Sequence, residues 1–203
     1  NRKGKTYLTD FAPYGPSYNA AASFTSSPIF SEGEMIAVLI FQMPIDKIDA
    51  VMSHDSNWES SGLGKTGQTY LVGHDMIMRS NDRLLLENKP LFLEKIDVLE
   101  MTPHAHKEVI SRDTTIGLLK VDTDSIKKAL SGEEGFMLTN NYFNEASLAV
   151  YRPLKIFGMS WVIVSEVAQD EAFLPVEELR KKIFKTLSYV SIIALVVGAL
   201  LGL

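Results

Sequence analysis

The first 43 residues show the alternation of apolar and polar positions that is typical of β-strands. Two runs, "AAASFTSSPIF" and "EMIAVLIFQMPI", are rich in β-branched and aromatic residues, and a short turn separates them. They predict a hairpin of two long strands. Because a three-stranded piece does not readily close a core of its own, we expect its partner strands upstream of Asn1.

The apolar spacing changes to three and four residues at the end of this β region. Ile45, Ile48 and Met52 share one face of a predicted short helix that begins at Pro44.

Strand and helix patterns then alternate as far as residue 167. We predict strands over 70–72, 76–78, 114–121, 135–143, 146–156 and 160–167, irregular helices within 81–112, and a helix over 122–132. Asp122 or Thr123 can cap the last helix, and Gly132 ends it. The segment therefore predicts an antiparallel sheet with helices packed to one side, an α+β fold.

The pattern is helical from residue 168 onward. Residues 187–203 contain no charged side chain, which predicts most of a transmembrane helix. A buried helix of a soluble core is the alternative, and an apolar surface on all sides fits it poorly. Before this run, apolar residues recur at three- and four-residue steps. Such spacing places the apolar residues on one face of the helix, and this face could pack against a copy of the same helix or against the chain's own domain.

Composition narrows the classes of function. The net charge is −5 and the basic residues are scattered, so we expect no nucleic-acid partner. The chain has no cysteine, which excludes disulfides, thiolate metal sites and cysteine nucleophiles.

A glycine-rich stretch, "GLGKTGQTYLVG" at 62–73, contains the spelling of two nucleotide-binding motifs. Glu59 stands where a Walker loop requires glycine, and the motif precedes a strand instead of following one. We therefore interpret the glycines as a structural loop that enters a strand.

Catalytic and metal chemistry have little support in the sequence. His104 and His106 could bind a metal in an extended segment, but a surface pair is the favoured interpretation. No Ser, His and Asp arrangement has the strand-turn-helix setting of a nucleophile elbow. We predict no catalytic residue, no metal and no cofactor.

A ligand-binding role remains. Arg79 and Ser80 end a predicted strand and face Tyr70 on the neighbouring one, so they could hold a carboxylate ligand. The alternative is an Arg79 ion pair with Asp82 or Asp75 at the surface.

A turn-rich loop near the N-terminus contributes further candidates. Tyr14, Tyr18 and Ser23 place aromatic and polar groups in and around this loop, the kind of segment that carries binding sites on a rigid sheet.

Taken in order, these segments resemble a known family. "SGLGKTGQTYLVGHDMIMRSNDRL" resembles the start of a Cache-type, PAS-like extracytoplasmic sensor module, which typically reads G-L-G-x-T-G-E-x-Y-L-V-G-x-D-x-x-M-R-S. "TTIGLLKVDTDSIKKALSGEEG" and "ASLAVYRPLKIFGMSWVIVSEVAQDEAF" match the rest of that module. The upstream strands resemble the end of a membrane-distal module in double-Cache receptors. Gln68 stands where Glu is commoner, and Asn81-Asp82-Arg83 replaces Ser-Arg-aromatic.

The resemblance implies an organisation for the whole chain. Residues 1–53 would be the end of the membrane-distal module with a linker helix, and 54–167 the membrane-proximal PAS-like module. Residues 168–186 would be a juxtamembrane signalling helix, and 187–203 a truncated transmembrane helix. Residues 1–186 would lie outside the cell (inner) membrane. The basic residues near Arg180 would favour the cytoplasmic side by the positive-inside rule alone, and the resemblance overrides that rule.

The resemblance also implies a homodimeric receptor with a cytoplasmic signalling domain beyond Leu203. A methyl-accepting chemotaxis receptor is the first choice for the whole protein. A histidine kinase and a nucleotide cyclase carry the same kind of module. A membrane-tethered enzyme domain and a module that senses a partner protein are rivals from other classes.

The resemblance does not name the ligand. Amino-acid-binding double-Cache receptors use an Arg-x-Trp-Tyr element, a Tyr-x-Asp element and a later Asp in the distal module. The first element would lie upstream of Asn1, and Tyr14-x-Pro16 stands where the second would fall. We therefore expect a small-molecule ligand of unknown class.

Overall fold

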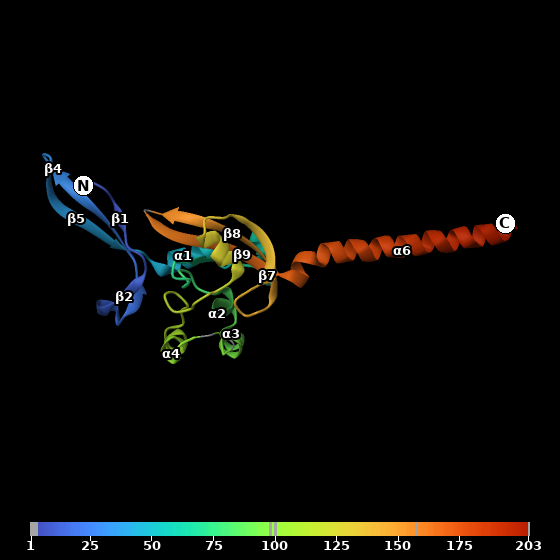
Figure 1. The fold of residues 1–203 in the computed structure, drawn as a ribbon, viewed down its shortest axis with the longest axis horizontal. Helices are drawn as coiled ribbons and strands as arrows, with labels where there is room; N and C mark the ends of the chain where they lie inside the picture. Colours follow the sequence, from blue (N-terminus) through green and yellow to red (C-terminus); the bar gives the residue numbers. More distant parts are fainter. Residues whose placement is uncertain (1–3, 98, 100, 157, 203) are drawn as a thin grey trace.

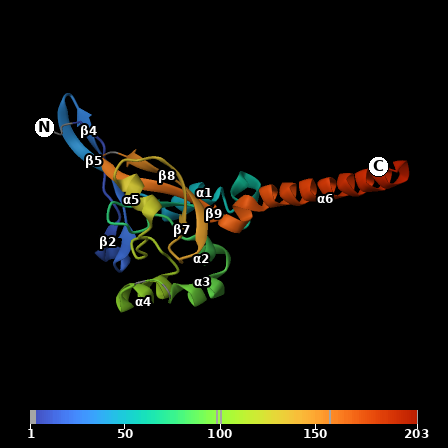
Figure 2. The same cartoon turned by 45° about the vertical axis from the view of Figure 1, so that its right-hand side comes forward.

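A computed structural model describes residues 4–97, 99, 101–156 and 158–202. It is an α+β structure with antiparallel sheets and flanking helices, as predicted. A compact body lies between two projections, a β ribbon near the N-terminus and one long helix at the C-terminus (Figure 1). Figure 2 shows the same two projections after a turn of 45°.

The N-terminal ribbon confirms the predicted hairpin. Its strands are β1 (Tyr7–Leu8), β2 (Ala12–Tyr14), β3 (Ala20–Ala22), β4 (Phe24–Ser31) and β5 (Glu34–Gln42). Strands β1, β4 and β5 form one antiparallel sheet in the order β1-β4-β5, and β2 pairs with β3. Every residue of β5 is exposed, although most of them are apolar. Met35, Ile36 and Ile40, for example, are each at least 60% exposed. Among the described residues this strand has no cover for its apolar side chains. That the partner strands lie upstream stays a prediction.

The main sheet contains four antiparallel strands in the order β6-β9-β8-β7. They are β6 (Gln68–Val72), β7 (Gly135–Asn140), β8 (Ala146–Ile156) and β9 (Met159–Ala168). The last three form the predicted meander. The register pairs Gln68 of β6 with Glu166 of β9, so the start of β6 lies beside the end of β9.

Helices lie against both faces of this sheet, so the prediction that they pack to one side is wrong. They are α1 (Ile45–Ser53), α2 (Arg83–Glu87), α3 (Lys89–Ile96), α4 (Pro103–Arg112) and α5 (Asp124–Leu130), with short turns η1 (Gly15–Ser17) and η2 (Glu59–Leu63). On one face, Tyr70 and Val164 pack with Ile126 of α5. On the other face, Leu71 and Trp161 pack with three apolar residues of α1. This alternation follows the two-residue period of a strand.

The helix α1 confirms the predicted apolar face. Its residues Ile45, Ile48 and Met52 contact the same cluster as Phe11, which comes from the N-terminal ribbon. At α5, Thr123 is the N-cap and accepts a hydrogen bond from the backbone of Ile126, as one of the two predicted caps.

Two predicted strands are wrong. Residues 76–78 and 114–121 contribute only the isolated bridges Val72↔Met78 and Ile77↔Lys120. Met76 has a φ of +61°, which turns the chain out of an extended path. In the second segment, Leu118 donates a backbone hydrogen bond to Thr115, so that stretch forms a turn. Both segments have apolar strand composition, but turns interrupt them, and they pair with each other only through a few backbone hydrogen bonds.

The C-terminal helix α6 (Gln169–Leu201) is continuous over 33 residues, as predicted from residue 168 onward. It is long and apolar enough to cross a membrane by length and composition, and none of its apolar window is buried against the body. Because β9 ends at Ala168 and α6 begins at Gln169, the sheet connects to this helix without a loop.

Candidate functional site

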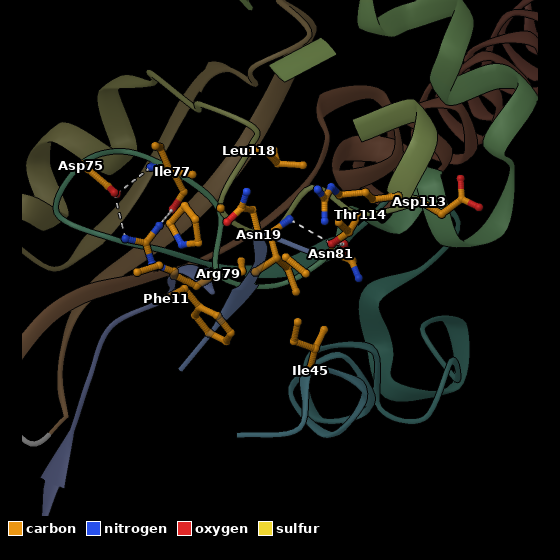
Figure 3. A pocket seen from close by; sticks show the side chains of 17 residues that line it. Phe11, Asn19, Ile45, Asp75, Ile77, Arg79, Asn81, Asp113, Thr114 and Leu118 are labelled. Atoms are coloured by element: carbon orange, nitrogen blue, oxygen red, sulfur yellow. Dashed lines mark hydrogen bonds and ion pairs between the residues drawn. The ribbon is translucent and has the colours of Figure 1, made fainter. Parts of the chain in front are cut away.

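Arg79 is the centre of a buried polar network. Its guanidinium donates two hydrogen bonds to Asp10, at 2.7 and 2.9 Å, and one to Asp75 at 2.9 Å. It also donates to the backbone carbonyl of Ile77 (Figure 3). The indole of Trp161 donates to the same carboxylate of Asp10 at 3.1 Å. The network therefore fastens the N-terminal ribbon to the main sheet.

The charges in this network stabilise one another. Burial raises the pKa of Asp10, but the hydrogen bonds and the charge of Arg79 outweigh it, so the net pKa of Asp10 is lowered. Burial lowers the pKa of Arg79, and its bonds to Asp10 and Asp75 outweigh that effect. Gly73 permits this arrangement, because a Cβ there would lie 2.3 Å from the guanidinium of Arg79.

A cavity of about 640 Å³ adjoins this network. Phe11 of the ribbon and Ile45 of α1 line one side, and Arg79, Asn81 and Thr114 line another (Figure 3). The volume is within the usual range for small-molecule sites, which is roughly 300–1,000 Å³.

The polar groups around this cavity already have partners in the protein. The side-chain amide of Asn81 donates to Asp49 at 2.6 Å, and its carbonyl accepts from Thr114 at 2.8 Å. Arg112 donates to Glu108 and to the backbone of Tyr18. The cavity is therefore balanced in charge, and its shape is held by hydrogen bonds from four segments of the chain.

The structure separates the candidate residues that the sequence grouped together. Arg79 lines the cavity, but Tyr70 lies on the opposite face of the sheet and donates to Glu166 at 3.2 Å. The hydroxyl of Ser80 accepts from the backbone of Leu71. The ion pair of Arg79 with Asp75 was one of the predicted alternatives, and it is buried on the Arg79 side. Asp10, the stronger partner, was not predicted.

The three candidates near the N-terminus lie outside the described lining of the cavity. The ring of Tyr14 packs edge-on against Phe24, with centroids 4.9 Å apart. Tyr18 is 89% exposed in a left-handed turn, and the buried hydroxyl of Ser23 donates to the backbone of Thr9 at 2.6 Å. A ligand-binding role for these residues stays a prediction.

The glycine-rich loop binds a carboxylate that belongs to the chain itself. Glu171, in the first turn of α6, accepts hydrogen bonds from the backbone N–H groups of Lys65 and Thr66, both at 2.8 Å. The hydroxyl of Thr66 donates to Glu171 at 2.5 Å and accepts from the backbone of Ala168. We call this set of bonds, formed by Lys65, Thr66, Ala168 and Glu171, the loop–helix contact.

Glycine is required where the loop meets the helix. A Cβ at Gly64 would lie 2.4 Å from Glu171, and the residue has a φ of +63°. The hydrogen bonds of Thr66 and Lys65 lower the pKa of Glu171, so the carboxylate stays ionised to lower pH. The interpretation of these glycines as structural is consistent with this geometry, and their function is to join the sheet to α6.

Known proteins similar to this chain are found among solved structures. No family model and no curated protein matches it. One of the similar solved structures is the ligand-binding domain of the Pseudomonas aeruginosa amino-acid chemoreceptor PctB in complex with L-Arg. That similarity has 16% identity and a TM-score of 0.47, and covers 84% of this chain and 57% of that one.

Two other similar structures are of related kinds. The periplasmic sensory domain of the Campylobacter jejuni chemoreceptor Tlp1 has 17% identity and a TM-score of 0.46, with 84% of this chain and 52% of that one covered. The extracellular domain of a histidine kinase has 18% identity and a TM-score of 0.45, with 86% and 53% covered. This chain thus spans about half the length of these structures.

The Arg79 network yields a stability prediction. Arg79→Ala leaves the carboxylates of Asp10 and Asp75 without their cation, which typically costs about 3–5 kcal/mol when the lost partner is buried. The free energy of unfolding should fall by that order in urea denaturation. Arg152→Ala is the matched control, because that side chain is 65% exposed and 3.9 Å from Glu134. Its cost should be about 0–1 kcal/mol. Equal stability of the two variants would contradict a structural role for Arg79.

The loop–helix contact yields a second prediction. Glu171→Gln removes the charge that the N–H groups of Lys65 and Thr66 bind, a loss on the order of 1 kcal/mol. Amide hydrogens in the first turn of α6 should then exchange roughly five-fold faster by hydrogen-exchange mass spectrometry. Glu177→Gln, further along the same helix, should leave exchange in that turn unchanged. Unchanged exchange in the Glu171 variant would show that the contact does not hold the helix.

Proposed function

We propose that this chain is the extracytoplasmic sensor region of a transmembrane signalling receptor, and that a methyl-accepting chemotaxis receptor is the best candidate for the whole protein. The sensor module senses a small molecule, and α6 carries the change across the membrane. In this role the chain catalyses no reaction.

The observation that carries the proposal is the junction between the sheet and α6. The strand β9 enters α6 directly, and the loop–helix contact fastens the first turn of α6 to the start of β6. A helix held in this way moves with the sheet. The apolar continuation of α6 is suited by length and composition to cross a membrane. The resemblance to Cache-type receptors also implies a transmembrane helix at this place.

Ligand binding would act by shifting a population between two arrangements of the sensor. The cavity beside Arg79 lies between the ribbon, the start of α1 and the turn segments 75–81 and 112–118, so a ligand there would contact four separate parts of the chain. A small displacement of α6 then reaches the cytoplasmic side. The dimer that such receptors form would use the exposed apolar residues of α6, including Val176, Leu179 and Ile183.

A histidine kinase or a nucleotide cyclase remains the second candidate for the whole protein, because both use the same kind of sensor module. These differ in the domain that follows α6, so the sensor mechanism is the same for all three.

A chimeric receptor tests the proposal. The 203-residue chain replaces the matching part of a characterised chemoreceptor, which supplies its own N-terminal membrane anchor and its cytoplasmic part. Swimming cells are then exposed to amino acids, carboxylates, amines, purines and sugars. At least one compound should change the tumbling frequency. The same compound at 100 times its dissociation constant should stabilise the protein by about 2.7 kcal/mol. For a chain of this size that corresponds to about 2–4 °C of melting shift per kcal/mol.

The Glu171→Gln variant provides the control. It should keep the melting shift and weaken the behavioural response, because binding remains while the loop–helix contact is lost. A compound that binds without any change in swimming would contradict a receptor role.

A further inference from the structure

A second cavity, of about 560 Å³, lies on the side of the main sheet where α6 begins. Its walls come from the start of β6, the end of β9, α2 and α3, the turn between β7 and β8, and the first residues of α6. Thr66, Ala168 and Asp170 are part of the lining, so the cavity adjoins the loop–helix contact.

Five polar side chains in the lining of this cavity are more than nine-tenths buried, and two of them, Arg83 and Ser147, are 7% and 1% exposed. The other three, Gln68, Asp82 and Glu166, are 8%, 0% and 4% exposed. Glu166 accepts hydrogen bonds from Gln68 at 3.1 Å and from the hydroxyl of Tyr70. Asp82 accepts from the hydroxyl of Tyr142 and from a backbone N–H of α2. All four donors are electrically neutral.

Two of the three cations that line the cavity are paired with carboxylates that also line it. Arg83 forms an ion pair with Glu87 at 2.7 Å, and Lys95 forms one with Glu145. The remaining charged lining consists of Asp82, Glu166, Asp170 and Lys65. Among the described residues, no ion pair reaches Asp82 or Glu166. Buried carboxylates without a counter-charge cost free energy. An ionised carboxylate can accept about four hydrogen bonds, and Glu166 uses two of these positions. Asp82 is more fully bonded, because Gln68 and the backbone of Leu84 also stabilise its charge.

We propose that this cavity binds a small organic cation with N–H donors, an ammonium or guanidinium group, whose charge lies against Asp82 and Glu166. The free acceptor positions of Glu166 match such donors, which form charge-assisted hydrogen bonds, and the charge of Asp82 adds to the attraction. The volume accommodates a cation with a short apolar chain. A metal ion fits less well, because the described residues contain no group of three or more His, Cys, Asp or Glu able to hold one.

The site has a defined pH dependence. Burial raises the pKa of Glu166 to about 7, and the charges of Asp82 and Glu145 act in the same direction. Burial also raises the pKa of Asp82. Below pH 7 a cation must displace the proton of Glu166, so its affinity falls with decreasing pH by up to about tenfold per unit. Above pH 7 Glu166 is ionised and the affinity levels off. The other ionisable group that bonds Glu166, Tyr70, has a pKa raised well above its usual value and stays neutral in this range.

Binding here would also affect the loop–helix contact, because Thr66 and Ala168 belong to both. This signalling consequence rests on the proposed function, whereas the binding itself does not.

Four probes of equal chain length test the binding: butylammonium, butylguanidinium, butyramide and butyrate. They are added to the whole 203-residue chain in detergent micelles at pH 8, and melting and calorimetric titration are measured. The two cations should bind and raise the melting temperature, and the neutral amide and the anion should not. Equal binding of butyramide, or no binding of either cation, would overturn the proposal.

Glu166→Gln localises the site, since it removes the charge and keeps the shape. The cations should bind at least tenfold more weakly to this variant. Glu134→Gln is the matched control, because its side chain is 71% exposed and lies outside the cavity, and cation affinity should be unchanged. Undiminished binding to the Glu166 variant would overturn the assignment.

A third measurement applies if Glu166→Gln does not fold. Titration of the unmodified protein near pH 7, in buffers of different ionisation enthalpy, should show that each bound cation releases up to one proton. Binding without proton release would contradict the site. None of these three assays has a signalling readout, so a failure here is distinguishable from failure of the chimeric receptor.

Discussion

The antiparallel pairing of β6 with β9 is the constraint on which the rest of the structure depends. Its register places Gln68 opposite Glu166. Two residues beyond this pair, Thr66 therefore lies beside Ala168, the last residue before α6. The hydroxyl of Thr66 accepts a hydrogen bond from the backbone N–H of Ala168. The same register brings the buried carboxylate of Glu166 next to the amide of Gln68. One set of backbone pairs thus positions both the loop–helix contact and the second cavity.

Two polar contacts connect the main sheet to the rest of the chain, one centred on a buried cation and the other on a carboxylate. Arg79 binds the N-terminal ribbon through Asp10, a charge pair that is mostly buried. At the start of α6, backbone N–H groups bind the carboxylate of Glu171, which is nearer to solvent. The first fastening favours a fixed arrangement, because breaking a buried pair is costly. The second is weaker and more accessible to change, which suits a contact that transmits a signal.

Much of the fold could be predicted from the sequence because its apolar periods are clear. The hairpin β4–β5, the meander β7–β9 and the helices α1 and α6 all follow from spacing alone. The segments 76–78 and 114–121 could not be predicted, because their strand-like composition is overridden by turns around Arg79 and Thr115. Those turns depend on partners far away in the sequence.

The site was less predictable for the same reason. Arg79 was identified, but its partner Asp10 lies 69 residues away, and no local pattern connects them. Glu171 was missed because a carboxylate in a first helical turn is ordinary. Glu166 did carry a signal, since it continues the inward-facing series of Val162 and Val164 in β9. A carboxylate at an inward position of a strand indicates a buried polar group.

The extracytoplasmic position of the sensor module is the central claim, and cysteine labelling tests it most directly. Because the chain has no cysteine, Glu134→Cys introduces a single thiol at an exposed position of the module. A membrane-impermeant maleimide is added to intact bacterial cells that produce this variant. If the module is extracytoplasmic, the thiol is labelled before the cells are opened. Labelling only after lysis would place the module in the cytoplasm and contradict the receptor assignment.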